Sequence, residues 1–157
     1  MLENKTVAFF GAGSMAESMI SGMIHAEKVP AQQIYVTNKF NGDRLTEIKE
    51  RYGVHTMLQK DLPYEEVDYF IMAMKPYGAE EALAFLKDKI RPDQVVVSVL
   101  AGISTSYMEE KLNDEQQVIR VMPNTSSMIQ ESATAMTLGS YTQKRHERDV
   151  KDLLACM

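Results

Sequence analysis

Short apolar runs alternate along this chain with amphipathic stretches of helical period. Apolar runs of this length, bounded by turn residues, are typical of buried strands. They predict strands at residues 7–10, 33–37, 54–57, 67–74, 94–99, 118–122 and 133–138. The stretches between them predict helices after residue 13, at 41–52, 76–89 and 104–112, and from 142 onward.

This order of elements predicts an α/β fold of the doubly wound, Rossmann-like type, with a mostly parallel sheet and helices on both faces. Gly53 is expected to cap the helix at 41–52, and Pro76 to begin the next helix, where its missing N–H costs little. No repeat or low-complexity linker divides the chain, so we expect residues 1–157 to form one domain. Because a doubly wound domain would add a strand after the last helix and none follows, we expect the chain to be truncated.

The first predicted strand runs directly into Gly11-Ala-Gly13-Ser-Met-Ala16, a glycine turn followed by a helix. Gly11 would let the backbone turn sharply, Gly13 would let a pyrophosphate approach, and Ala16 would allow close packing of helix on strand. The free N–H groups at the start of the helix would bind the phosphates. The motif therefore predicts a dinucleotide site, and the alternative is a glycine turn that binds nothing.

Composition and charge narrow the class of protein. With 45% hydrophobic and 25% charged residues, the 157-residue chain has the composition of an ordinary globular domain. A net charge of -5 and an isoelectric point near 5.2 disfavour a nucleic-acid partner. No apolar run approaches the ~20 residues that span a bilayer, and no leader precedes the first strand, so we expect a cytoplasmic protein without a membrane partner.

The residues that most often bind metals or form disulfides are few. Cys156 is the single cysteine, and it is expected to pack as a small side chain. His25, His55 and His146 are scattered, with no carboxylate or cysteine at ligand spacing. We therefore expect no metal site.

The end of the second predicted strand bears on which nucleotide would bind. An Asp or Glu there would select NAD, but the strand ends in Thr37-Asn38-Lys39. Asn38 can donate a hydrogen bond and Lys39 supplies a positive charge, which favours the 2′-phosphate of NADP. The alternative is that Asn38 only ends the strand and Lys39 is a solvated surface lysine.

Three further strand ends carry polar residues or glycine, and ligands of open parallel sheets bind beyond such ends. Lys75 would put a cation there, Gly102 would allow close backbone approach, and Asn124 would offer an amide. Each also has an ordinary interpretation, with Lys75 as a solvated lysine, Ser98 as a strand-end hydroxyl and Asn124 as a turn residue. Their occurrence at successive strand ends favours a site.

Five motifs, in this order and spacing, resemble pyrroline-5-carboxylate reductase. They are residues 11–16 (GAGSMA), 37–39 (TNK), 73–76 (AMKP), 98–103 (SVLAGI) and 118–124 (VIRVMPN). The resemblance implies an N-terminal NADP-binding domain of an enzyme that reduces 1-pyrroline-5-carboxylate to proline, the last step of proline biosynthesis. It also implies that a helical domain follows, which forms the homodimer or higher oligomer and supplies much of the substrate pocket.

The resemblance also implies roles for individual residues. The cofactor-binding residues would be Phe10, Gly11, Ala12, Gly13, Ser14, Met15, Asn38, Lys39, Ala73, Met74, Lys75, Pro76, Ala101 and Gly102. Lys75 and Asn124 would be the catalytic residues, with Lys75 acting through positioning and electrostatics and Asn124 facing the substrate. Many family members carry Arg where Lys39 stands, and a lysine lacks the planar, bidentate contacts of a guanidinium. NADP is therefore the expected cofactor, with NAD as the alternative.

The function implied is hydride transfer from NADPH to the C=N bond of a small-molecule substrate. Two alternatives stay open: a related β-hydroxyacid or imine reductase, and a non-catalytic NADP-binding redox sensor or regulator. The isolated chain is expected to bind cofactor but to be almost inactive, because the groups that bind the substrate carboxylate would lie beyond residue 157.

Overall fold

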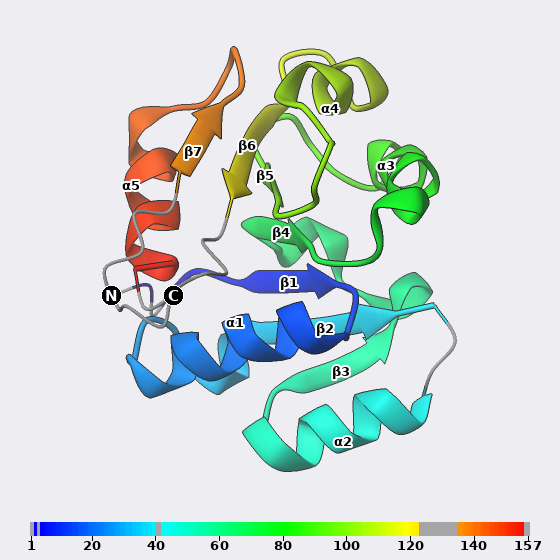
Figure 1. Cartoon of the computed structure of the whole chain (residues 1–157), viewed down its shortest axis with the longest axis vertical. Helices are drawn as coiled ribbons and strands as arrows, with labels where there is room; N and C mark the ends of the chain where they lie inside the picture. The colour runs from blue at the N-terminus through cyan, green and yellow to red at the C-terminus, as the bar shows by residue number, and fades with distance from the viewer. Residues whose placement is uncertain (1, 3, 40–41, 123–134, 156–157) are drawn as a thin grey trace.

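A seven-stranded sheet in the order β3-β2-β1-β4-β5-β6-β7 organises the computed structural model of this chain (Figure 1). The structure describes residues 2, 4–39, 42–122 and 135–155. The strands are β1 (Val7–Phe10), β2 (Ile34–Asn38), β3 (His55–Leu58), β4 (Tyr69–Met72), β5 (Val95–Ser98), β6 (Gln117–Met122) and β7 (Ala135–Leu138). The helices are α1 (Ser14–His25), α2 (Gly42–Tyr52), α3 (Ala79–Lys87), α4 (Thr105–Lys111) and α5 (Lys144–Leu153). Short 3₁₀ turns lie at Ala31–Gln33, Gln59–Asp61, Tyr64–Glu66 and Pro76–Gly78.

Strands β1 to β6 are parallel and β7 is antiparallel to β6. The order changes direction at β1, since β2 lies on one side of it and β4 on the other. This is the doubly wound arrangement, and the predicted fold class is confirmed. A ligand site is expected at such a switch point, beyond the carboxyl ends of the strands.

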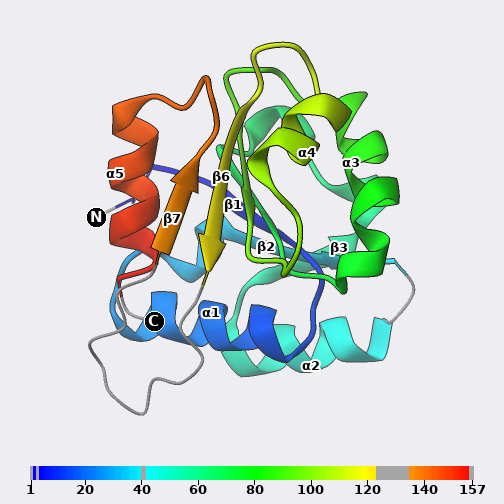
Figure 2. The same ribbon diagram turned by 45° about the horizontal axis from the view of Figure 1, so that its top comes forward.

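Alternating strand residues build two separate cores, one on each face of the sheet. Phe9, Ile71 and Val97 face one core, which α1, α2 and α5 cover. The neighbouring residues Phe10 and Phe70 face the other, which α3 and α4 cover. Figure 2 shows the two sets of helices on opposite sides of the strands. Because the strands are buried on both faces, they read in the sequence as continuous apolar runs rather than alternating ones.

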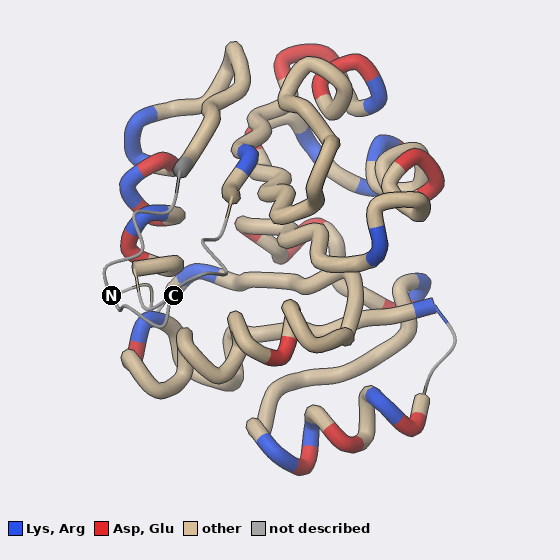
Figure 3. The backbone as a smooth tube through the Cα atoms, in the orientation of Figure 1, with Lys and Arg blue, Asp and Glu red and all other residues tan. Residues whose placement is uncertain are grey.

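Charged residues are confined largely to the helices and loops, as Figure 3 shows for α2, α3 and α5. On α2, Leu45 and Ile48 are the buried positions, and the charged residues lie on the remaining faces. In the described part of the chain, no helix is long and apolar enough to cross a membrane.

The observed elements differ from the predicted ones mainly at their ends. The strand predicted at 67–74 is limited to Tyr69–Met72, because residues 64–66 already form a 3₁₀ turn that Val67 closes. The helix predicted from Pro76 begins as the 3₁₀ turn Pro76–Gly78 and becomes α-helical at Ala79. Gly53 caps α2 as predicted, with a φ of 74° and its N–H donating to the Lys49 carbonyl.

Candidate functional site

The carboxyl ends of the parallel strands meet along one edge of the sheet. Phe10 of β1 pairs in register with Thr37 of β2 and with Met72 of β4. Met72 pairs in turn with Ser98 of β5, which pairs with Arg120 of β6. The loops that carry most of the predicted site residues therefore leave the sheet side by side.

Gly11 makes the turn out of β1, and it cannot be replaced by another residue without strain. Its φ is +113°, a conformation that L side chains rarely adopt. A Cβ there would lie 2.7 Å from the carbonyl carbon of Ala73 and 2.7 Å from the backbone nitrogen of Met74. The Gly11 N–H donates to the Thr37 carbonyl at 2.9 Å. The loop after β1 is thus packed directly against the loop after β4.

Gly13 has a different environment, since nothing lies within 4 Å of a Cβ built on it. It is the N-cap of α1, with an ordinary φ of −86°, and no side chain caps the helix. Gly13 and Ser14 are exposed, and Met15 is partly exposed. An uncapped helix N-terminus beside open space at the edge of a parallel sheet is a suitable site for a phosphate or pyrophosphate anion.

At the end of β1 and in the loop after it, the predicted cofactor-binding residues Phe10 and Ala12 turn their side chains into the protein. The Phe10 side chain lies in the core under α3 and α4, and its carbonyl accepts a hydrogen bond from the Ala73 N–H at 2.8 Å. Ala12 is buried in the opposite core. Phe10 and Ala12 would therefore contact a ligand through their backbone atoms and not through their side chains.

Lys39, directly after β2, forms an ion pair with Glu81 of α3. Its side chain is 42% exposed and that of Glu81 is 70% exposed. Asn38 beside it is partly buried. The lysine is therefore at the edge where it was predicted, but a carboxylate shares its charge.

The loop after β4 presents its residues in order of increasing exposure. Ala73 is buried and Met74 is half-buried, whereas Lys75 and Pro76 are exposed. Tyr77 is 91% exposed. Lys75 is the N-cap residue of the 3₁₀ turn, and its side chain is exposed.

The ends of β5 and β6 contribute a turn and two buried polar groups. The Ser98 hydroxyl accepts a hydrogen bond from the Leu100 N–H at 3.1 Å, which is the strand-end role weighed in the sequence. Ala101 and Gly102 are exposed in the turn that follows, and Gly102 has a φ of 77°. Among the described residues (2, 4–39, 42–122 and 135–155), the Nε of Arg120 is buried without a hydrogen-bond partner. The predicted site residue Asn124 lies outside the described residues.

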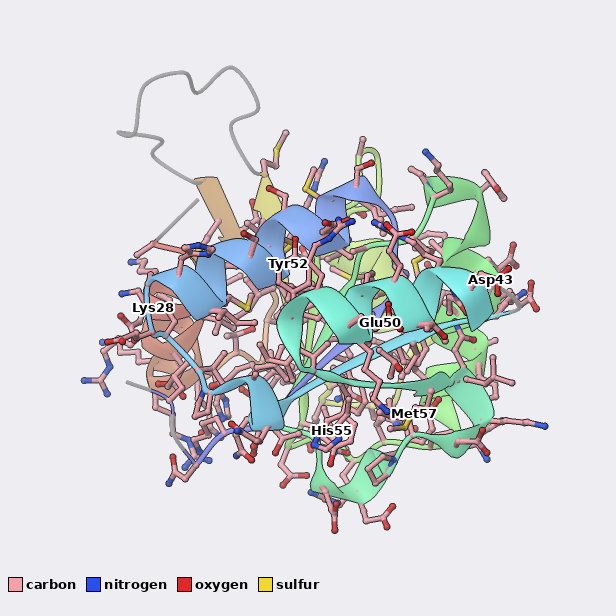
Figure 4. The ribbon with its side chains drawn as sticks, turned by 90° about the horizontal axis from the view of Figure 1, so that it is seen from below. Lys28, Asp43, Glu50, Tyr52, His55 and Met57 are labelled. Carbon is pink, nitrogen blue, oxygen red and sulfur yellow. The ribbon has the colours of Figure 1, made fainter. Side chains whose placement is uncertain are left out.

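Sequence reasoning missed a charged cluster between α1 and α2. Glu17, in the first turn of α1, accepts hydrogen bonds from Arg44 at 2.6 Å, from the Tyr52 hydroxyl at 2.7 Å and from Arg51. These donors hold the pKa of the Glu17 carboxyl down at about 2, with Tyr52 making the largest contribution. Figure 4 shows Tyr52 between the two helices. Periodicity could not reveal the cluster, because Glu17 and Arg44 are 27 positions apart in the sequence.

Comparison with known proteins gives one matching family model and several relatives. The family model described as "NADP oxidoreductase coenzyme F420-dependent" matches residues 6–102. Pyrroline-5-carboxylate reductase 1 of Bacillus subtilis (strain 168) is 52% identical over 157 residues, which cover 100% of this chain and 53% of that protein. The chain spans about half the length of the curated relatives that it matches.

Two solved structures that share the fold of this chain are also named as pyrroline carboxylate reductases. A pyrroline-5-carboxylate reductase from Coxiella burnetii superposes with a TM-score of 0.87 at 27% identity, covering 98% of this chain and 57% of the other. The Plasmodium falciparum pyrroline carboxylate reductase, determined with NADP bound, superposes with a TM-score of 0.83 at 19% identity. The match covers 99% of this chain and 56% of the Plasmodium protein. The second likeness is one of fold alone.

Proposed function

We propose that this chain, which belongs to the family described as NADP oxidoreductase coenzyme F420-dependent, is the nucleotide-binding domain of an NADP-dependent pyrroline-5-carboxylate reductase. The observation that supports this substrate is the similarity of all 157 residues to the Bacillus subtilis reductase. The reaction would reduce the C=N bond of 1-pyrroline-5-carboxylate to give proline.

The open N-terminus of α1 suits the site to a dinucleotide. The N–H groups of Gly13, Ser14 and Met15 would hold the pyrophosphate, because no side chain caps this helix. Asn38 and Lys39 would bind the 2′-phosphate. Residues 73–76, with Ala101 and Gly102, would border the nicotinamide and its ribose. NAD, which lacks the 2′-phosphate, would bind more weakly.

Bound NADPH would supply the hydride for the reduction, and the protein would supply orientation and charge. The exposed Lys75 is suited to an electrostatic role at the rim, toward the carboxylate of an approaching substrate. Asn124 would face the substrate side. None of the proposed site residues carries a carboxyl or imidazole group, so the proposal includes no general acid among them.

The same proposal implies how this chain would lie within a longer protein. Residues 1–157 would act as one domain of a longer cytoplasmic protein, whose remaining part forms the homodimer and completes the substrate pocket. The substrate and product would be small molecules. A non-catalytic NADP-binding regulator is not favoured, because the relatives that match over the whole chain are reductases; such a regulator would bind the nucleotide equally well but would not reduce the imine in the full-length protein.

The proposal is tested by titrating the chain with NADPH and NADH and following nucleotide fluorescence. We expect NADPH to bind more tightly, and Lys39→Asp to abolish the preference, because a carboxylate repels the 2′-phosphate. Glu81→Gln is the matched variant, since it removes the carboxylate that competes for Lys39. It should strengthen NADPH binding about two- to threefold, as suits an exposed ion pair, and leave NADH unchanged. A folded chain that binds neither nucleotide would contradict the proposal.

A further inference from the structure

Arg44 joins the first turn of α2 to the glycine loop. Its Nε donates a hydrogen bond to the Ala12 carbonyl at 2.6 Å. One of its terminal nitrogens donates to the Gly13 carbonyl at 3.4 Å. These two carbonyls belong to the segment that leads from the Gly11 turn into α1, so a side chain from another helix holds the loop on which the proposed nucleotide site depends.

A hydrogen bond to a carbonyl also orients the next N–H. In a planar trans peptide, the C=O of one residue and the N–H of the following residue point in opposite directions. When Arg44 holds the Ala12 carbonyl, the Gly13 N–H must point away from Arg44. The Gly13 carbonyl is held by Arg44 and by the Glu17 N–H, at 3.0 Å, which directs the Ser14 N–H out of the helix end.

The guanidinium is itself held on its other edges. It donates to Glu17 at 2.6 Å and to Glu47 at 2.7 Å. Its side chain is 22% exposed, and that of Glu17 is 19% exposed. Two carboxylates therefore balance its charge, and its planar fork is fixed in direction. An Arg in this arrangement acts on the loop through directional hydrogen bonds rather than as a free cation.

Arg51 shares these carboxylates but not the loop. It forms ion pairs with Glu17 and Glu47, and among the described residues it donates to no carbonyl of the glycine loop. Comparison of the two arginines of α2 therefore distinguishes two roles. One role is to join α2 to α1 through Glu17, and the other is to orient the peptides of the loop.

We propose that Arg44 is a positioning residue for the nucleotide: it fixes the peptides after Ala12 and Gly13 so that their N–H groups point at the pyrophosphate. This inference rests on the proposed function, because it needs a dinucleotide at the α1 N-terminus. It assigns Arg44 to the part of the ligand that NADPH and NADH share. A residue that bound the 2′-phosphate would act on NADPH alone.

The test compares Arg44→Met with Arg51→Met in the same 157-residue chain, measuring the Kd of NADPH and of NADH and the thermal midpoint without nucleotide. We expect Arg44→Met to weaken both nucleotides by a similar factor of about ten, corresponding to about 1.4 kcal/mol. Arg51→Met should leave both Kd values within about twofold, since the loop keeps its contacts. Both variants should lower the thermal midpoint, because each removes an ion pair of Glu17.

A second readout follows the loop directly. In the wild type, inorganic pyrophosphate should shift the backbone amide resonances of Gly13 and Ser14. The shifts should be smaller in Arg44→Met at the same pyrophosphate concentration, and retained in Arg51→Met. Arg44→Lys should fall between the wild type and Arg44→Met, because an ammonium can reach one carbonyl but cannot reproduce the planar fork.

Three results would overturn the inference, and they differ in whether the proposed function survives. Loss of NADPH affinity alone would make Arg44 a 2′-phosphate contact. A lowered thermal midpoint with unchanged Kd values would leave it a structural residue only. In both cases the proposed function survives. If the folded wild type binds neither nucleotide, the proposed function fails and the positioning role fails with it.

Discussion

At the scale of single residues, the two glycines of the loop have opposite requirements. Gly11 is needed by the fold, because its φ is positive and backbone atoms of the β4 loop fill the space beside it. Gly13 is not needed by the fold, because its φ is ordinary and the space beside it is open. The sequence predicts the turn at Gly11, which the geometry confirms, and ligand approach at Gly13, which stays a prediction beside open space.

The pair Gly11→Ala and Gly13→Ala tests this division. Gly11→Ala should lower the free energy of unfolding by about 2 kcal/mol or more, from backbone strain and the contact with Ala73. Gly13→Ala should change it by less than about 0.5 kcal/mol but weaken NADPH about tenfold, because the methyl group would occupy the approach of the phosphates. Urea unfolding and nucleotide titration measure the two effects. Equal destabilisation by both substitutions would contradict the assignment.

At the scale of elements, α5 docks through polar contacts at the amino ends of β4 and β6, away from the proposed nucleotide site. The His146 ring lies edge-on to the Tyr69 ring, with centroids 5.9 Å apart, and its Nδ1 is 2.5 Å from the Gln117 side-chain oxygen. The Tyr69 hydroxyl donates to Asp149 at 2.5 Å. Burial of Tyr69, strengthened by Asp149, raises the pKa of its hydroxyl, so that it stays protonated.

His146 should make the stability of the fold depend on pH. Burial, followed by the nearby charge of Arg145, lowers the pKa of His146 below its usual 6.5, against the opposing effect of Asp149 and Asp68. The unfolded chain therefore binds more protons below pH 6.5, and stability that is complete above 6.5 falls as the pH is lowered. The slope from one such group is at most about 1.4 kcal/mol per pH unit.

The measurement is urea unfolding of the wild type and His146→Gln at pH 7.5, 6.5 and 5.5. The variant should lose less stability than the wild type between pH 6.5 and 5.5. His25→Gln is the matched control, because His25 is exposed at the end of α1. A wild type and a His146→Gln variant with the same slope would show that burial of this ring does not control the acid sensitivity.

At the scale of the whole molecule, nucleotide binding and turnover are expected to separate. We expect this chain to bind NADPH yet to reduce 1-pyrroline-5-carboxylate at least about 100-fold more slowly than a full-length relative, because an imine that is not held beside the nicotinamide loses the benefit of orientation. NADPH oxidation at saturating cofactor measures the rate, with the Bacillus subtilis reductase as the reference. Comparable turnover by the two proteins would locate the substrate site within these 157 residues.

The sequence by itself determined the strands, the helices and the glycine turn, because these depend on local periodicity and on residues a few positions apart. The run Val7–Phe10, the start of α1 and the cap at Gly53 were all readable in this way. Their boundaries were less exact, as at 67–74 and 76–89, because 3₁₀ turns and strand ends depend on neighbouring elements. The fold class followed from the order of the elements.

Only the tertiary structure decided which side chains share the site. Packing of α2 on α1 brings Arg44 to the Ala12 carbonyl, and packing of α3 beside the end of β2 brings Glu81 to Lys39. No periodic pattern joins residues so far apart in the chain, so neither the ion pair of Lys39 nor the hydrogen bonds of Arg44 could be predicted from the sequence. Hydrogen bonds of this kind depend on the relative placement of whole elements, which the two cores of the sheet determine.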